Sequence, residues 1–120
     1  METNEITEKV IGCAIRVSNT LGTGFLEKVY ENALALELQN TGLAFEQQHP
    51  IQVRYQGTVV GDFAADMVIE RQVIVELKAV RMLDPAHEAQ VLNYLRATGI
   101  RVGLLLNFGT PKLEIKRFML

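Results

Sequence analysis

A continuous apolar run, RVGLLLNF at residues 101–108, places the strongest constraint on how this chain can fold. A strand with one solvent-exposed face alternates apolar and polar side chains, whereas a strand covered on both faces is apolar throughout. The run therefore predicts an interior strand. Pro111 ends it, and the alternating segment 113–120 predicts an edge strand.

Helical periodicity dominates the N-terminal third of the chain. Apolar residues recur at helical spacing over residues 5–20 and again over 25–40, which predicts two helices. A third helix begins at Asp84-Pro85, because aspartate is a good N-cap and proline suits the first helical position. It is expected to run to about Ala97.

Strand periodicity begins in the middle of the chain. Residues 51–55 alternate apolar and polar, 58–69 read as a strand bent near Gly61, and 73–78 follow after a short polar turn. The order is helix, helix, strands, helix, strands. It predicts an α/β fold in which a mostly antiparallel meander is followed by a helical crossover, within one domain spanning residues 1–120.

Composition narrows the class of protein. Apolar residues make up 48% and charged residues 22%, which is typical of a soluble globular domain. One cysteine excludes an internal disulfide and a multi-cysteine zinc site. The apolar runs are shorter than the ~18–20 residues of a membrane span, and the polar start METNEITEKV does not resemble a secretory signal. We expect a cytoplasmic protein without a membrane partner.

Net charge argues against binding to nucleic acid through bulk charge. The formal charge is −2, whereas proteins held on phosphates by overall charge are usually basic. Any contact with nucleic acid would therefore have to rest on a local patch.

Two carboxylates and a lysine are brought together by the predicted hairpin. If residues 70–72 form a three-residue turn, Asp66 lies opposite Glu76, with Cβ atoms ~4.5–5.5 Å apart. Lys78 shares the face of Glu76 because side chains two apart on a strand point the same way. A two-residue turn would instead place the two carboxylates on opposite faces.

Carboxylates this close repel each other unless a cation or a proton neutralises one of them. Two carboxylates completed by water suit Mg²⁺. Such a site could hydrolyse phosphodiesters, with Lys78 positioning water or stabilising developing charge. The alternative is that Glu76 and Lys78 are an ordinary solvent-facing pair on a strand.

At this point the sequence resembles a known family. Asp66 followed by Glu76-Leu77-Lys78 resembles the signature of the PD-(D/E)XK nuclease superfamily. GFLEKVY at residues 24–30 is similar to the motif that names the GxxExxY family, and the likeness extends through residues 75–80, 87–95 and 103–109. The resemblance implies a restriction-endonuclease-like PD-(D/E)XK core, with a mixed central sheet flanked by helices and two N-terminal helices.

The resemblance also implies roles for individual residues. Asp66 and Glu76 would be metal ligands, Lys78 the catalytic lysine, and Glu27 a helix-borne acid that approaches the same metal. The implied cofactor is Mg²⁺ or Mn²⁺. A helix-capping role for Glu27, with Gly24 as the N-cap, is an equal alternative.

Gln90 and Tyr94 match the QxxxY motif of one exonuclease-like branch, in which both residues lie beside the catalytic centre. Their spacing of four puts them on one helical face. The alternative is a solvent-facing Gln90 and a Tyr94 at the edge of the core. His87, one turn into the same helix, is interpreted as a surface residue.

The expected function is metal-dependent hydrolysis of phosphodiester bonds in nucleic acid, with DNA as the expected substrate. A catalytically silent nuclease-fold module that binds nucleic acid or a protein partner is the alternative. It is favoured by the acidic balance and by Ala64, where the resemblance leads us to expect an arginine; Ala65 stands where the superfamily signature has its proline. A third possibility is an oligomeric structural protein that pairs through strand 113–120. We expect so small a nuclease to act as a homodimer in order to reach two strands. DNA or RNA, and end or interior cleavage, stay open.

Overall fold

The computed structural model describes residues 1–120 as three helices and five strands. In chain order the elements are α1 (Thr3–Leu21), α2 (Glu27–Thr41), β1 (Phe45–Tyr55), β2 (Thr58–Ile69), β3 (Val73–Lys78), α3 (Pro85–Thr98), β4 (Val102–Asn107) and β5 (Glu114–Met119). The strands form one sheet in the order β1-β2-β3-β4-β5. Only β3 and β4 are parallel. The prediction of a mixed α/β fold is confirmed.

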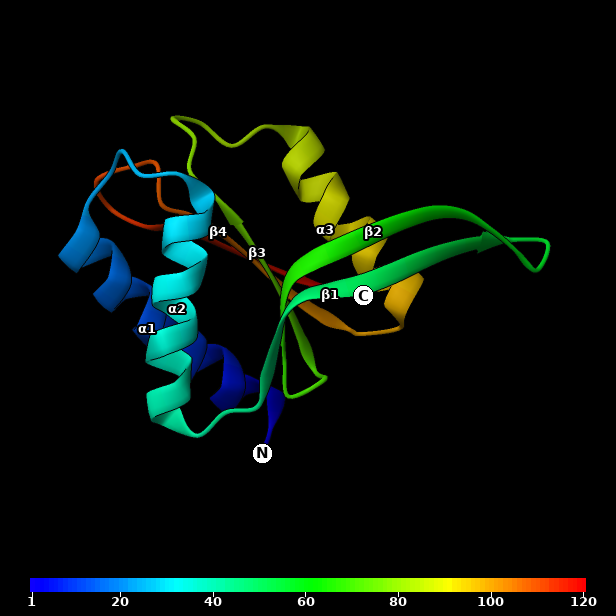
Figure 1. Cartoon of the computed structure of the whole chain (residues 1–120), viewed down its shortest axis with the longest axis horizontal. Helices are drawn as coiled ribbons and strands as arrows, with labels where there is room; N and C mark the ends of the chain where they lie inside the picture. Colours follow the sequence, from blue (N-terminus) through cyan, green and yellow to red (C-terminus); the bar gives the residue numbers. More distant parts are fainter.

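Helices cover both faces of the sheet (Figure 1). α1 and α2 pack on one face and form a cluster of 20 buried residues with the strands, whereas α3 covers the other face over a smaller cluster of 8. Every residue of β4 is buried, and Leu104 and Leu105 belong to opposite clusters. The prediction of an interior strand is therefore confirmed, and β5 lies at the sheet edge as expected. None of the three helices combines the length and apolar character needed to cross a membrane.

α3 begins with the predicted cap. Asp84 accepts a hydrogen bond at Oδ1 from the Ala86 backbone N–H (2.6 Å), and its own backbone N–H donates to His87 Nδ1 (3.1 Å). His87 is therefore a capping residue rather than a simple surface histidine. Gly99 ends the helix in the left-handed conformation. The helix then returns the chain to β4, parallel to β3.

β1 begins six residues earlier than the sequence predicts, at Phe45 instead of Ile51. The missed segment, FEQQHP, is mostly polar, so it lacks the alternation expected of a half-buried strand. His49, which precedes the strand predicted at 51–55, therefore lies within β1. Pro50 is tolerated there because β1 is an edge strand, where a missing backbone donor leaves no neighbour unpaired.

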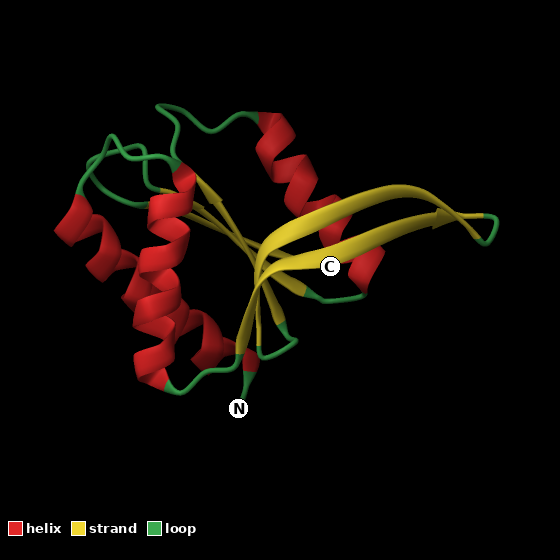
Figure 2. Ribbon diagram, viewed as in Figure 1, coloured by secondary structure: helices red, strands yellow, loops and turns green.

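β1 and β2 form a long hairpin arm that projects beyond the rest of the sheet (Figure 2). β2 pairs with β3 only over Met67–Ile69, while its earlier residues pair with β1 alone. Ala65 belongs to the cluster under α3, but Met67, two residues on, belongs to the cluster under α1 and α2. Side chains two apart on a regular strand point to the same face, so the regular alternation of β2 is interrupted at Asp66. Asp66 therefore lies at the junction of the arm and the sheet.

The loop after β3 is anchored to the end of β4. The Asn107 side chain accepts from the Val80 backbone N–H (3.0 Å) and donates to the Val80 carbonyl (2.9 Å), and Asn107 is fully buried. The Phe108 backbone N–H donates to the Lys78 carbonyl (2.8 Å). A β-carbon at Gly109 would collide with backbone atoms of Val80. This close approach holds the end of β3, which carries Lys78.

Gly109→Ala is expected to lower the free energy of unfolding by about 3 kcal/mol, because backbone rather than a flexible side chain must move. The matched control is Gly12→Ala. Gly12 lies inside α1 with its nearest contact at 3.9 Å, so alanine should raise the free energy of unfolding by about 0.5–1 kcal/mol. Chemical denaturation measures both. Equal stability of the Gly109 variant and the native chain would contradict the prediction.

Candidate active site

Asp66 and Glu76 lie where β2 separates from β3. The paired register runs from Ile69 opposite Val73 to Met67 opposite Val75, which confirms the predicted three-residue turn at 70–72. Beyond that point side chains replace the backbone ladder. Glu76 Oε2 accepts from the Asp66 backbone N–H (2.6 Å), and Asp66 Oδ2 accepts from the Leu77 backbone N–H (2.9 Å). Each carboxylate is therefore fixed by the backbone of the opposing strand.

Burial makes this pair electrostatically unusual. Glu76 is only 2% exposed, and burial, followed by the Asp66 charge, raises the pKa of Glu76 to about 8. Burial also raises the pKa of Asp66, although hydrogen bonds from the Leu77 backbone and the Gln48 side chain oppose the shift. Without a bound cation, Glu76 therefore keeps its proton at neutral pH, since the two buried charges repel.

Lys78 supplies the positive charge of the site. It ends β3 and is half-buried. Its charge acts to lower the pKa values of Glu27, Asp66 and Glu76, so it lies within electrostatic reach of all three carboxylates. Its ammonium group makes no salt bridge of its own. It is therefore free to meet an anion that enters the site.

Glu27 approaches the pair from α2. It is the first residue of that helix, and Leu26, not Gly24, is the N-cap, without a side-chain cap bond. Gly24 is therefore not the N-cap, but Glu27 does lie in the first turn, where a negative charge suits the helix dipole. Burial of its carboxyl raises the pKa of Glu27, the Lys78 charge opposes this, and the Asp66 charge adds to it. Glu27 thus faces the same group of charges.

Tyr30 fixes the loop that leads into α2. It is fully buried, its hydroxyl donates to the Gly22 carbonyl (2.6 Å), and its ring stacks on Phe108 with centroids 4.8 Å apart. The Phe25 backbone N–H donates to the same hydroxyl (3.3 Å). The final tyrosine of the GFLEKVY segment therefore anchors the start of the helix that carries Glu27.

Sequence reasoning missed two residues of the site, Glu31 and Gln48. Glu31 is 4% exposed and accepts from Gln48 Nε2 (2.8 Å), Gln47 Nε2 (2.7 Å) and Lys28 Nζ (3.0 Å). Gln48 Nε2 also donates to Asp66 Oδ1 (3.3 Å), so it connects α2 to the carboxylate pair.

One of these two residues carries a sequence signal. Glu31 follows Glu27 by four, so both lie on one helical face. Gln48 has a backbone φ of 52°, a left-handed conformation that is rare for residues other than glycine. Nothing in its neighbouring sequence indicates that strain, which arises at the junction of the arm with the sheet.

Gln90 and Tyr94 contact each other on α3, as their spacing predicts: Gln90 Nε2 donates to Tyr94 Oη (3.2 Å). Burial, and then the charge of Glu76, raises the pKa of Tyr94, with a smaller contribution from Asp66. Tyr94 therefore lies near the carboxylates while also belonging to the core under α3. Gln90 Oε1 is buried without a hydrogen-bond partner.

The carboxylate pair could hold a divalent metal ion. No three acidic, histidine or cysteine side chains converge closely enough to hold an ion among them, so Glu27 is not gathered with the pair as a third ligand. Asp66 and Glu76 alone offer two carboxylates in a polar site beside a half-buried lysine. That donor set suits Mg²⁺, which keeps several waters and needs few protein ligands.

Comparison with known proteins assigns the family. A family model described as the PD-(D/E)XK nuclease superfamily matches residues 4–118. The chain belongs to this superfamily. Neither the curated proteins nor the solved structures contain a match. PD-(D/E)XK nucleases generally use divalent metals, and the mixed sheet with helices on both faces is consistent with their fold.

Proposed function

We propose that this chain is a Mg²⁺- or Mn²⁺-dependent nuclease that hydrolyses phosphodiester bonds, with DNA as the expected substrate. We also propose that it is a GxxExxY protein, because Gly24, Glu27 and Tyr30 match that motif. One observation carries the function. Asp66 and Glu76 are each held by the backbone of the opposing strand, beside an ammonium group that has no partner of its own.

The carboxylates are the proposed metal ligands. A divalent ion held there would supply charge neutralisation at the scissile phosphate and Lewis-acid activation of water. The two backbone hydrogen bonds hold Asp66 and Glu76 in place before the substrate arrives, which lowers the cost of organising the site. Gln48 and Glu31 support Asp66 from the side of α2.

The remaining residues are proposed to act on the substrate or beside the metal. Lys78 is the proposed catalytic lysine, because its unpaired ammonium can stabilise negative charge that develops on phosphate oxygens. Tyr94 and Gln90 are proposed to orient the substrate through their linked polar groups. Glu27 is not gathered with Asp66 and Glu76, so we propose that it approaches the metal from α2 as a third acid rather than as a preformed ligand. Its side chain lies within the field of Lys78 and Asp66 at the exposed start of α2.

Cleavage in the presence of different ions tests the proposal. Purified protein should cut single- or double-stranded nucleic acid with Mg²⁺ or Mn²⁺ and should be inactive in EDTA. Asp66→Ala should abolish cutting, whereas Asp62→Ala, on the exposed part of the same strand, should not. Cutting in EDTA, or cutting by the Asp66 variant at the native rate, would refute a metal-dependent mechanism at this site.

A catalytically silent module is the second candidate, favoured by the absence of a third converging metal ligand. Calorimetric titration separates the two functions. Binding of Mn²⁺ that is lost in Asp66→Ala supports the nuclease. Binding of nucleic acid or of a protein partner without any metal binding supports the module. A cytoplasmic location and a homodimer are further parts of the proposal, and light scattering measures the oligomeric state.

A further inference from the structure

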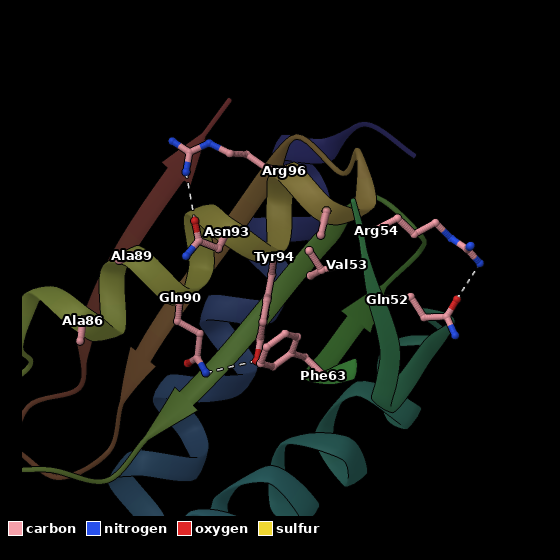
Figure 3. Close-up of a pocket in the computed structure, with 11 residues that line it drawn as sticks. Gln52, Val53, Arg54, Phe63, Ala86, Ala89, Gln90, Asn93, Tyr94 and Arg96 are labelled. Carbon is pink, nitrogen blue, oxygen red and sulfur yellow. Dashed lines mark hydrogen bonds between the residues drawn. The ribbon is translucent and has the colours of Figure 1, made fainter. Parts of the chain in front are cut away.

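A groove separates the hairpin arm from α3, on the side of the sheet that α3 covers (Figure 3). Its volume is about 890 Å³, and residues of β1, β2 and α3 line it. Tyr94 and Gln90 lie in its wall, so the groove leads toward the carboxylate pair. It is therefore a surface beside the site, large enough for a small organic group.

An exposed aromatic ring lies in this groove. Phe63 on β2 is 51% exposed. Its ring lies 6.0 Å from that of Tyr94, tilted by 46°. A β-carbon at Gly61 would approach the Phe63 ring to 2.9 Å, so the glycine gives the ring room against the strand. Phe63 thus offers a supported, solvent-accessible π-face.

Positive charge is the only formal charge of the groove. Arg54 on β1 and Arg96 on α3 are among its lining residues, and no aspartate or glutamate is. Figure 3 shows the two guanidinium groups beside neutral side chains, to which each donates a hydrogen bond: Arg54 to Gln52 (3.1 Å) and Arg96 to Asn93 (3.1 Å). Neither arginine pairs with a carboxylate. The rim therefore favours an anion in a molecule whose net charge is −2.

Polar groups for a ligand also face this groove. The amides of Gln52, Asn93 and Gln90 are in its lining, and Gln90 Oε1 is buried without a partner. Amide side chains can pair with the donor and acceptor edge of a nucleobase.

We propose that the groove binds an unpaired nucleobase of a single-stranded nucleic acid, stacked on Phe63, with the adjoining phosphates at Arg54 and Arg96. The inference rests on the proposed function, because the bound strand is the substrate. Phe63 precedes Asp66 by three residues, or about 10 Å along a strand. The bound base would therefore lie a short distance along β2 from the carboxylates.

Stacking explains why the substrate class is a single strand. A duplex binder gains affinity from many phosphate contacts, which a chain of charge −2 with two cations at the groove does not provide. Stacking on an aromatic ring is worth about 1–3 kcal/mol per base and does not need high charge, but the base must be unpaired.

Binding of labelled oligonucleotides in EDTA tests the groove without catalysis. Fluorescence anisotropy should show that single-stranded oligonucleotides bind at least about 10-fold more tightly than the duplex of the same sequence. Parallel titrations with DNA and with RNA oligonucleotides identify which of the two the groove prefers. Phe63→Ala should weaken binding by about 10-fold, and Phe63→Tyr should retain it. Arg54→Gln and Arg96→Gln should each lower the slope of log affinity against log salt by about 0.7.

Tyr55→Ala is the matched control. Tyr55 is a 67% exposed aromatic residue on the same arm, outside the groove, so its removal should leave affinity unchanged. Equal effects of the Phe63 and Tyr55 variants, or equal binding of duplex, would overturn the proposal. If cleavage depends on metal but is unchanged in Phe63→Ala, the groove proposal is refuted and the proposed nuclease function stands. If binding depends on Phe63 but no cleavage occurs, the groove proposal stands and the proposed hydrolysis is refuted.

Discussion

Lys78→Ala is expected to lower the rate of metal-dependent phosphodiester cleavage by about 10³-fold, the cost typical of losing one group that stabilises transition-state charge. Lys78 is the cation at the end of β3, within reach of three carboxylates and without a salt bridge. Its loss removes positive charge from the place where phosphate charge would develop. Initial rates at saturating Mn²⁺ measure the effect.

Metal binding separates the role of Lys78 from that of the ligands. Lys78→Ala should still bind Mn²⁺ in a calorimetric titration, because the carboxylates remain, whereas Asp66→Ala should not. Lys78→Arg should recover part of the rate, since the charge returns with a different geometry. Lys112→Ala, in an exposed loop, is the matched control and should cleave at the native rate. Native activity in Lys78→Ala would exclude this lysine from catalysis.

The metal-free protein is expected to lose stability as the pH rises from 4.5 to about 8, through Glu76. Burial, and then the Asp66 charge, raises the pKa of this carboxyl from 4.5 to about 8 in the folded chain. Between these values the unfolded chain has released the proton that the folded chain keeps. Each pH unit therefore lowers the free energy of unfolding by up to about 1.4 kcal/mol. The stabilisation is complete below pH 4.5 and is lost as the pH passes through 8.

Glu76→Gln should flatten this dependence, because an amide has no proton to release in this range. Urea denaturation in EDTA across the pH range measures the slope. Glu8→Gln, on the exposed side of α1, removes the same formal charge and should change stability by less than about 0.5 kcal/mol. Mg²⁺ or Mn²⁺ should stabilise the native chain most at the upper end of the range, since ligands bind deprotonated. An unchanged slope in Glu76→Gln would contradict the assignment.

The carboxylate pair was predictable because it depends on a short hairpin. The turn at 70–72 sets the register, and the register sets which residues oppose each other. The sequence did not indicate that the ladder ends at Met67 opposite Val75, so that the two side chains bond to backbone N–H groups instead. That opening depends on where the arm leaves the sheet.

The rest of the site was not predictable from local pattern. Glu31 is buried because Gln47 and Gln48, from another element, supply its hydrogen bonds. In the sequence, Phe63 is not distinguishable from the other apolar residues of its strand. Only the tertiary structure shows that it lines a groove between α3 and the arm. Neither role follows from residues nearby in the chain.

Sequence alone determined the elements whose causes are local: the buried strand at 101–108, the capped third helix, and the hairpin that faces Asp66 with Glu76. Periodicity and turn chemistry act over a few residues, so they are readable in a single chain. Tertiary structure decided the polar start of β1, the strained Gln48, the burial that raises the pKa of Glu76, and the groove. Each of these depends on desolvation and contact between segments distant in sequence, which no local pattern records.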